Sequence, residues 1–315
     1  MNAAGSARPA ILVTGSDLAA QALASLGDYD MVYAGAKPSD EDIVNLCRQR
    51  NPVAIIVRYG KVGAAAMDAA PNLRVISKHG SGTDTIDKHA AAQRGIEVVA
   101  AAGANAAAVA EQALALLLAC AKSIVSLDAR MRDGHWDKAT HKSLELAGKT
   151  IGLVGLGAIG QRMGAMVHSM QMRVIGYDPY ADNLPDYIES VPLERLWSES
   201  DVISLHCPLT ETNREMVNAA TLALCRPGMI LVNTARGGLV NEQALLDALH
   251  SGHVMAAGLD SFAVEPMVQD HPFQRESGIV LSPHIGGVTG AAYVNMGVAA
   301  ARNALAVLAS TSAHS

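Results

Sequence analysis

The first third of the chain alternates short apolar runs with stretches of helical periodicity. Each run is rich in Val, Ile and Ala and has the length of a strand that is buried on both faces. Strands that alternate with helices in this way predict a parallel sheet covered by helices. The predicted strands cover residues 10–14, 30–34, 53–58, 73–77 and 96–99. A long Ala/Leu-rich helix follows them, with Asn105 as its expected N-cap.

A second alternating series occupies the rest of the chain. Its predicted strands cover residues 150–155, 172–178, 201–206, 228–235, 254–260 and 278–284. Helices are expected to begin near Ala158, Arg214 and Asn241, and a last Ala-rich helix is expected at about 291–308. Six strands in this pattern predict a doubly wound sheet of the kind that binds dinucleotides. With 315 residues, the chain is long enough for two α/β domains.

Composition narrows the classes of function. Half of the residues are apolar but only 3% are aromatic, so the cores must be packed from Ala, Val, Leu and Ile. The formal net charge of -6 offers no electrostatic attraction to nucleic acid or to an anionic membrane, and neither is expected as a partner. The four cysteines have no C-x-x-C spacing, which argues against a disulfide framework and against a metal site.

Glu111 and Gln112 interrupt the most apolar segment, Val98–Ala121, and leave no uninterrupted apolar stretch long enough to span a membrane. We expect it to be a helix buried between the two domains. The first nine residues lack a charged start followed by an apolar core, so no signal peptide is expected. These features together predict a soluble, cytoplasmic protein.

A glycine-rich turn is the first candidate site. Gly155-Leu156-Gly157-Ala158-Ile159-Gly160 follows a predicted strand and opens a predicted helix. The first glycine permits a tight turn, the second lets the backbone approach a pyrophosphate, and the third lets helix and strand pack closely. The free N–H groups at the helix N-terminus favour phosphates. The expected cofactor-binding residues here are Gly155, Gly157, Ala158, Ile159 and Gly160.

Asp178 ends the strand that follows this helix. Its carboxylate is placed to accept hydrogen bonds from the adenosine ribose hydroxyls and to repel a 2′-phosphate. No arginine follows it in Pro179-Tyr180-Ala181, so NAD is favoured over NADP. The structural alternative is a glycine turn with an Asp that caps a loop.

Charged side chains follow the last strands of the second series, where ligands bind in open α/β sheets. They are Arg236, Asp260, Glu265 and His284. An arginine can stabilise a developing alkoxide and bind a neighbouring carboxylate in fork geometry. A histidine can supply the proton near neutral pH, and a carboxylate partner would orient its ring. Taken singly, each of these residues could equally be an ordinary loop residue.

Taken together, these residues and their neighbours resemble the D-isomer-specific 2-hydroxyacid dehydrogenases. The resemblance covers nearly the whole chain. The matching motifs are Gly80–Asp87, Asn105–Glu111, Gly155–Gly160, His206–Thr210, Asn233–Gly238, Gly258–Asp260, Glu265-Pro266 and Ser282–Gly287. In combination they are specific to that family.

The resemblance implies roles for individual residues. Arg236 is expected to bind the substrate carboxylate and carbonyl, His284 to act as acid and base, and Glu265 to tune the histidine. Ser81 and Gly82 match a loop whose backbone amides hold the substrate carboxylate. The remaining implied contacts are Asn105 at the interdomain cleft, Asp260 at the nicotinamide carboxamide, and His206, Cys207, Pro208, Thr212, Thr234, Ala235 and Gly286 around NAD.

The resemblance also implies the domain organisation. Residues 1–102 plus 288–315 would form a flavodoxin-like substrate-binding domain, and residues 103–287 a Rossmann NAD-binding domain. Related proteins are usually dimers that pair through the nucleotide domain. The segment that begins at Gly134-His135-Trp136 matches the pairing region, and an exposed Trp would be costly on a monomer. A homodimer is therefore expected.

The substrate is expected to be a small 2-oxo or 2-hydroxy acid, such as hydroxypyruvate or glyoxylate. Phosphoglycerate dehydrogenases carry Arg-Ser-x-Thr where this chain has Arg58-Tyr59-Gly60-Lys61. Arg58 remains a candidate for binding a distal anion, although the hydroxyl side chains are absent. Lys78 and His79 leave room for a polar substrate tail, or are simply a solvated strand end. Formate oxidation is not expected, because formate dehydrogenases have Gln at the position of Glu265.

Two alternatives stay open beside the leading hypothesis of a 2-oxo acid reductase. The first is oxidation of D-3-phosphoglycerate. The second is an NAD-sensing corepressor, a binding module with weak catalysis, for which the chain shows no added segment that would recruit peptides.

Overall fold

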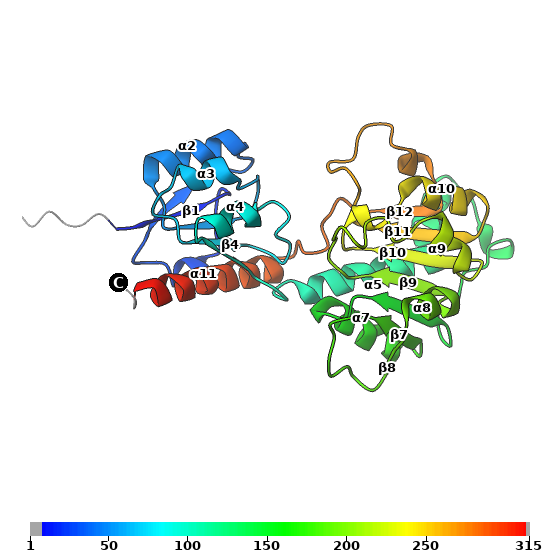
Figure 1. Ribbon diagram of the computed structural model, residues 1–315. Helices are drawn as coiled ribbons and strands as arrows, with labels where there is room; N and C mark the ends of the chain where they lie inside the picture. The colour runs from blue at the N-terminus through cyan, green and yellow to red at the C-terminus, as the bar shows by residue number, and fades with distance from the viewer. Residues whose placement is uncertain (1–7, 313–315) are drawn as a thin grey trace, which may run out of the picture. The chain divides into compact units, whose positions relative to one another are not determined.

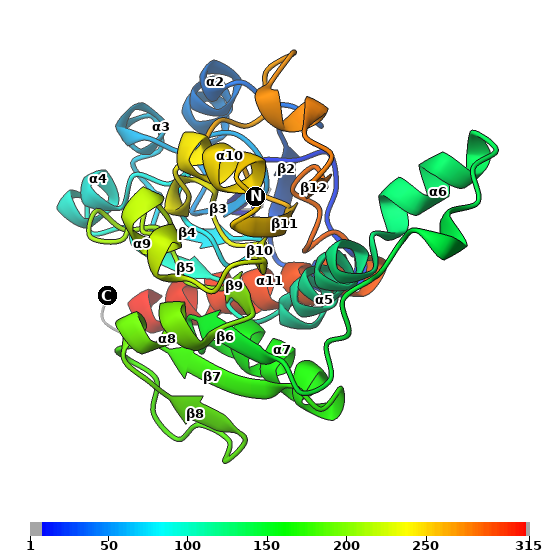
Figure 2. The same cartoon turned by 90° about the vertical axis from the view of Figure 1, so that its right-hand side faces the viewer.

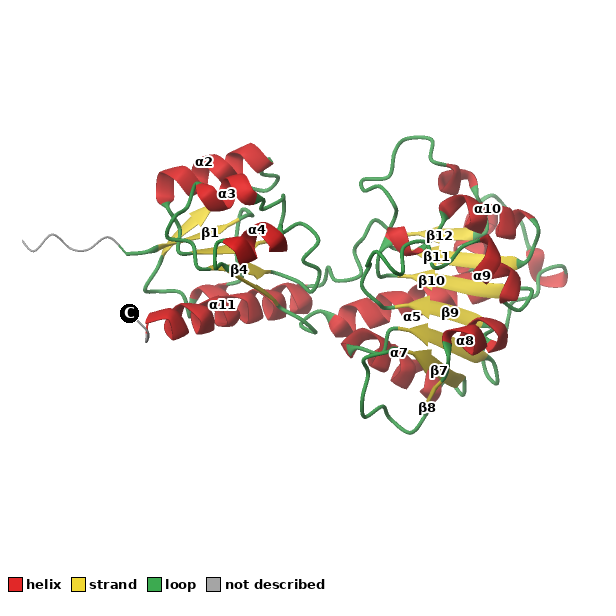
Figure 3. Ribbon diagram, viewed as in Figure 1, coloured by secondary structure: helices red, strands yellow, loops and turns green. Residues whose placement is uncertain are grey.

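The computed structural model describes residues 8–312, which form two compact units (Figure 1). Within the described residues, unit 1 comprises residues 8–105 and 288–312, and unit 2 comprises residues 106–287. The sequence-based expectation placed the first boundary after residue 102, three residues earlier than the structure does. Both units are parallel sheets covered by helices, which confirms the predicted α/β class (Figure 3).

Unit 1 is built on a five-stranded sheet with the order β2-β1-β3-β4-β5. All of its strand pairs are parallel. Its strands are β1 (Ala10–Val13), β2 (Asp30–Tyr33), β3 (Ala54–Val57), β4 (Val75–Lys78) and β5 (Glu97–Ala100). Its helices are α1 (Ala20–Leu23), α2 (Asp40–Arg50), α3 (Ala64–Asp68), α4 (Lys88–Gln93) and α11 (Gly290–Ser312).

Neighbouring residues of the unit 1 strands face opposite layers, as strand geometry requires. Ile11 and Ile56 pack with α1 and α11 on one face, whereas Leu12 and Ile55 pack with α2 and α3 on the other. All four side chains are fully buried. Burial on both faces explains why these strands are continuous apolar runs and not alternating ones.

Unit 2 is built on a seven-stranded parallel sheet with the order β12-β11-β10-β9-β6-β7-β8. Its strands are β6 (Thr150–Val154), β7 (Arg173–Tyr177), β8 (Ile188–Ser190), β9 (Val202–Leu205), β10 (Met229–Asn233), β11 (Val254–Leu259) and β12 (Ile279–Leu281). Its α-helices are α5 (Ala106–Lys122), α6 (Ile124–Arg132), α7 (Ala158–Ser169), α8 (Leu193–Glu199), α9 (Ala219–Leu224) and α10 (Glu242–His250). Three 3₁₀ turns complete it: η1 (Asp137–Ala139), η2 (Gly237–Leu239) and η3 (Pro272–Arg275).

The chain order of the unit 2 strands reverses at β6, which lies between β7 and β9. This is the switch point at which doubly wound sheets bind dinucleotides, beyond the carboxyl ends of the strands. Helices α5 and α7 cover one face and α8, α9 and α10 the other (Figure 1). The fold therefore directs the glycine-rich turn after β6 toward the expected cofactor position.

One helix start was predicted wrongly, and two elements were not predicted. A helix was expected near Arg214, but α9 begins at Ala219, because the Asn218 side chain accepts from the backbone N–H groups of Ala220 and Thr221 and caps the helix there. The edge strand β8 and helix α8 were not predicted. β8 has only three residues, of which Glu189 and Ser190 are exposed, so it carries little of the apolar signal of a strand.

Helix α6 and the turn η1 extend away from the sheet of unit 2 (Figure 2). No residue of α6 is buried, whereas α5 contributes nine buried residues to the core. None of the described helices is by itself long and apolar enough to cross a membrane. Only α5 and α6 together reach that length and composition, and they are bent by 59° at the break between them.

Candidate active site

The glycine-rich turn after β6 requires glycine at two positions for steric reasons. Gly155 has φ +95°, and a Cβ added there would lie 2.7 Å from the backbone nitrogen of Cys207. A Cβ on Gly160 would lie 2.0 Å from the carbonyl oxygen of Gly155. Gly157 differs, because nothing lies within 4 Å of its hypothetical Cβ. The open side of Gly157 is where a pyrophosphate can approach the backbone.

Helix α7 begins directly after Gly157, and no side chain caps its first N–H groups. Uncapped N–H groups and the positive end of the helix dipole together favour a phosphate group at this point. The side chain of Gln161 instead donates to the carbonyl oxygen of Leu156, which stabilises the turn. The turn and the helix therefore fit the pyrophosphate of NAD.

Asp178 lies just after β7, beside the same turn. Its Oδ2 accepts from the backbone N–H of Leu156 at 2.8 Å, and its Oδ1 accepts from the N–H of Tyr180 at 2.9 Å. These bonds hold the carboxylate next to the glycine-rich turn. A carboxylate oxygen can accept two hydrogen bonds, so both oxygens can still accept from ribose hydroxyls.

The segment after β9 supplies the opposite wall of the turn. His206 Nε2 pairs with the hydroxyl of Ser204 at 2.9 Å, and burial lowers the pKa of His206 to about 4, so the ring is neutral. Burial also raises the pKa of the Cys207 thiol to about 11. Neither side chain supplies charge, and we expect this segment to contribute shape and backbone contacts.

Thr234 follows β10, and the described residues offer its buried hydroxyl no hydrogen-bond partner. Buried hydroxyls are rarely left without a partner, and such an atom at the carboxyl end of the sheet fits a contact with a ligand. Thr212 lies on the exposed loop after β9 and pairs with the hydroxyl of Thr210 at 3.0 Å.

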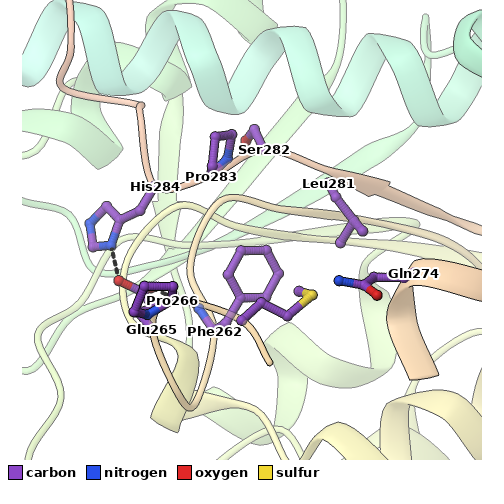
Figure 4. A pocket seen from close by; sticks show the side chains of 9 residues that line it. Phe262, Glu265, Pro266, Gln274, Leu281, Ser282, Pro283 and His284 are labelled. Atoms are coloured by element: carbon purple, nitrogen blue, oxygen red, sulfur yellow. Dashed lines mark hydrogen bonds and ion pairs between the residues drawn. The ribbon is translucent and has the colours of Figure 1, made fainter. Parts of the chain in front are cut away.

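His284 and Glu265 form a close pair (Figure 4). Nδ1 of His284 lies 2.6 Å from Oε2 of Glu265. The other carboxylate oxygen, Oε1, accepts from the backbone N–H of Phe262 at 3.0 Å, so the carboxylate is held at both ends. With Nδ1 bound in this way, Nε2 is the nitrogen of His284 that remains for proton transfer.

The loop that carries His284 is anchored by Asp260. This carboxylate is 1% exposed. Oδ1 accepts from the Ser282 hydroxyl at 2.6 Å and from the Ile285 N–H at 3.0 Å, and Oδ2 accepts from the Gly286 N–H at 2.8 Å. These contacts lie on both sides of His284, whose φ of 53° is uncommon for a residue other than glycine. Asp260 therefore positions the histidine loop, a role that sequence reasoning did not assign.

Arg236 lies on the turn between β10 and η2, and a buried asparagine shapes this turn. The Asn233 side chain donates to the carbonyl oxygen of Arg236 at 2.9 Å and accepts from the N–H of Ala235 at 3.0 Å. A Cβ on Gly237 would lie 1.9 Å from the backbone carbon of Phe262. The turn that carries Arg236 thus packs against the segment to which Glu265 is bound.

A pocket of about 500 Å³ adjoins the histidine–glutamate pair. Glu265 and His284 lie at one end of it, and most of the remaining lining is apolar (Figure 4). The other lining residues are Phe262, Pro266, Met267, Gln274, Leu281, Ser282 and Pro283. Sequence reasoning did not find this pocket, because loops of different strands contribute its lining.

The candidate substrate-binding residues Arg58, Ser81, Gly82 and Asn105 belong to unit 1. Ser81 and Gly82 lie in the loop after β4, and the Ser81 hydroxyl donates to Oδ1 of Asn105 at 3.2 Å. Asn105 precedes α5 as expected, but the hydrogen bond found for its side chain is to Ser81. Within unit 2 the structure brings Asp260, Glu265 and His284 together.

Comparison with known proteins is consistent with this geometry. Residues 114–286 match the family model described as the NAD-binding domain of D-isomer-specific 2-hydroxyacid dehydrogenases. A hydroxypyruvate reductase of Thermotoga maritima is 41% identical over 248 residues, which are 78% of this chain and 81% of that protein.

Two further relatives extend the comparison. A D-3-phosphoglycerate dehydrogenase of Mycobacterium leprae is 39% identical over 96% of this chain, which spans only 57% of that longer protein. The crystal structure of a glyoxylate reductase from Paecilomyes thermophila superimposes with a TM-score of 0.84 at 27% identity, covering 94% of each chain.

Proposed function

The chain belongs to the D-isomer-specific 2-hydroxyacid dehydrogenase family and is an NAD-dependent oxidoreductase acting on CH–OH groups, and from that premise we propose that it reduces small 2-oxo acids such as hydroxypyruvate and glyoxylate. The observation that carries the proposal is the 2.6 Å contact between His284 and Glu265 on a loop anchored by Asp260. A proton donor held in this way suits the reduction of a carbonyl group.

When bound, NADH supplies the hydride that the C2 carbon of the substrate accepts. His284 donates a proton from Nε2 to the carbonyl oxygen, while Glu265 holds Nδ1 and stabilises the charged ring. Arg236 stabilises the negative charge that develops on that oxygen and binds the neighbouring carboxylate through its planar fork. In the oxidation of a 2-hydroxy acid, neutral His284 accepts the proton instead.

Unit 1 contributes substrate-binding residues in this proposal. The backbone N–H groups of Ser81 and Gly82 bind the substrate carboxylate, and Asn105 orients Ser81 through their 3.2 Å hydrogen bond. Arg58 borders the tail of the substrate. Asp260, beyond anchoring the histidine loop, is the candidate contact for the nicotinamide carboxamide, and Thr234 and Gly286 are further candidate cofactor contacts.

The test is turnover of NADH by the purified protein with hydroxypyruvate, glyoxylate and acetaldehyde. We expect both 2-oxo acids to be reduced, and acetaldehyde to be a poor substrate because it lacks the carboxylate that Arg236 binds. Comparable activity on acetaldehyde would refute the proposal. A protein that bound NADH but reduced no 2-oxo acid would support the corepressor-like alternative.

Asp178 is expected to determine the preference for NADH over NADPH. Asp178→Ala should weaken NADH binding and ease NADPH entry, because it removes both the acceptor for the ribose hydroxyls and the charge that repels a 2′-phosphate. The measurement is kcat/KM with each cofactor. Asp182→Ala is the matched control, since Asp182 is an exposed carboxylate in the same loop. Equal efficiency of the unmodified protein with both cofactors would contradict the assignment.

We also propose a homodimer that pairs through the segment from α6 to η1. Its exposed apolar side chains support this proposal, with Ile124 at 54%, Met131 at 57% and Trp136 at 75% exposure. A monomer in light scattering at micromolar concentration would refute it.

A cytoplasmic location is proposed as well, where the free thiols of the four cysteines remain reduced.

A further inference from the structure

The sheet of unit 1 has its own switch point, between β1 and β3. Sheets of this strand order bind ligands in the crevice beyond the carboxyl ends of these two strands. Asp17 follows β1 and Arg58 directly follows β3. The two side chains therefore meet at the point of unit 1 where a ligand group would be expected.

Arg58 is bound to other groups of unit 1 at this point. Its Nη1 donates to Oδ1 of Asp17 and, at 2.7 Å, to the carbonyl oxygen of Asp17. The hydroxyl of Tyr293, at the start of α11, donates to the same Oδ1 at 2.9 Å. We call these three residues the Asp17 cluster.

Two aromatic rings cover the guanidinium. Its central carbon lies 5.0 Å from the ring centroid of Tyr293 and 5.3 Å from that of Tyr59, which are cation–π distances. Only 12% of the Arg58 side chain is exposed. A guanidinium that is paired, covered and largely buried offers few donors to a new anion.

The charge of Arg58 is cancelled within the cluster. Hydrogen bonds from Tyr293 and from Arg58 hold the pKa of Asp17 below its usual range, so the carboxylate is ionised at neutral pH. The neighbouring basic residue His79 is also without charge, because burial lowers its pKa to about 4. Lys78 Nζ lies 3.3 Å from the carbonyl oxygen of Arg58, to which it donates.

A phosphate monoester carries about 1.5 to 2 negative charges at neutral pH, and its recognition uses accessible guanidinium or ammonium groups. At this edge of unit 1, Arg58 is neutralised by Asp17, His79 is uncharged, and the ammonium of Lys78 donates to the carbonyl oxygen of Arg58. A distal phosphate would have to approach the negatively charged carboxylate of Asp17. It could not form bidentate hydrogen bonds with the guanidinium of Arg58, because that group is already bound to Asp17. A substrate whose tail ends in a hydrogen atom or a hydroxyl group carries no charge there, so the carboxylate of Asp17 does not repel it.

We propose that the Asp17 cluster determines substrate specificity by excluding 2-oxo acids with a distal phosphate. The preferred substrates are unphosphorylated 2-oxo acids with a hydrogen or hydroxyl tail, and Asp17 is a specificity-determining residue. This inference rests on the proposed function and narrows it, because it separates reduction of hydroxypyruvate from the chemistry of phosphoglycerate dehydrogenases.

The experiment compares kcat/KM for 3-phosphohydroxypyruvate and for hydroxypyruvate with NADH. The unmodified protein is expected to prefer hydroxypyruvate. Asp17→Asn should raise the ratio of phosphorylated to unphosphorylated efficiency by about tenfold or more, since one hydrogen bond between charged groups contributes roughly that much to binding. The gain should be a lower KM for the phosphorylated substrate, and inorganic phosphate should become a competitive inhibitor.

Two controls accompany this variant. Asp30→Asn breaks an exposed ion pair with Arg50 elsewhere in unit 1 and should leave the ratio unchanged. Adding Arg58→Met to Asp17→Asn should remove the gain, because the released guanidinium is the group that binds phosphate. Tyr293→Phe, which removes only one hydrogen bond to Asp17, should raise the ratio by a smaller amount.

An unmodified protein that prefers 3-phosphohydroxypyruvate would overturn the inference, and so would an Asp17→Asn variant that reduces hydroxypyruvate with an unchanged ratio. An equal rise in the Asp30→Asn control would also overturn it. Failure of the unmodified protein to reduce any 2-oxo acid would instead refute the proposed function on which the inference rests.

Discussion

His284→Ala is expected to lower kcat for the best 2-oxo acid by ~10²–10⁴-fold, the range attributed to a positioned general acid. Alanine cannot donate the proton that the alkoxide oxygen must receive, and the nearest carboxylate, Glu265, loses the ring that it orients at 2.6 Å. The dissociation constant of NADH should change little, because the glycine-rich turn and Asp178 lie on other loops. Stopped-flow turnover and fluorescence titration with NADH measure the two effects separately.

His250→Ala is the matched control for this variant. His250 forms a comparable pair with Glu276, at 2.9 Å, on the exposed surface of unit 2. Its removal should leave kcat unchanged. Glu265→Gln should give an intermediate loss, since the amide keeps the shape but not the charge that stabilises the imidazolium. Near-normal turnover by His284→Ala would eliminate His284 as the acid.

Arg236→Lys is expected to lower kcat/KM for 2-oxo acids by ~10²–10³-fold, comparable to the loss of a donor that stabilises a developing oxyanion. An ammonium keeps the charge but cannot bind the carboxylate and the carbonyl oxygen together through a planar fork. Because the fork also binds the ground state, KM should rise as well as kcat fall. Steady-state kinetics over a wide range of substrate concentration resolves the two parameters.

The control for Arg236→Lys is Arg226→Lys in the same unit. Arg226 contacts Asp201 at 3.4 Å and its side chain is about half exposed. Its replacement by lysine should therefore leave kcat/KM for 2-oxo acids unchanged. A variant Arg236→Lys that kept most of its kcat/KM would show that the charge alone is sufficient. The proposed bidentate role of Arg236 would then be wrong.

The sequence by itself was sufficient for the fold class and for the cofactor. Buried strands such as β3 and β10 are continuous apolar runs, because helices cover both faces of a parallel sheet. The glycine-rich turn is equally local. The steric need for Gly160 arises from Gly155, only five positions earlier, so a short motif carries the whole requirement. The helix start at Ala219 escaped prediction, because a capping asparagine and not the apolar period determined it.

The specific contacts of the sites were decided by the tertiary structure. Sequence reasoning named Glu265 as the partner of His284, but not the anchoring of the histidine loop by Asp260, which depends on how β11 and β12 pair. The pairing of Asp17 with Tyr293 joins residues 276 positions apart, and no periodicity or motif records such a contact. From the sequence, Arg58 is predicted only to be a cation that could bind a distal anion of the substrate. Only the fold of unit 1, which brings Asp17 after β1 next to Arg58 after β3, decides that this charge is already neutralised, and the packing of α11 adds Tyr293 to the pair.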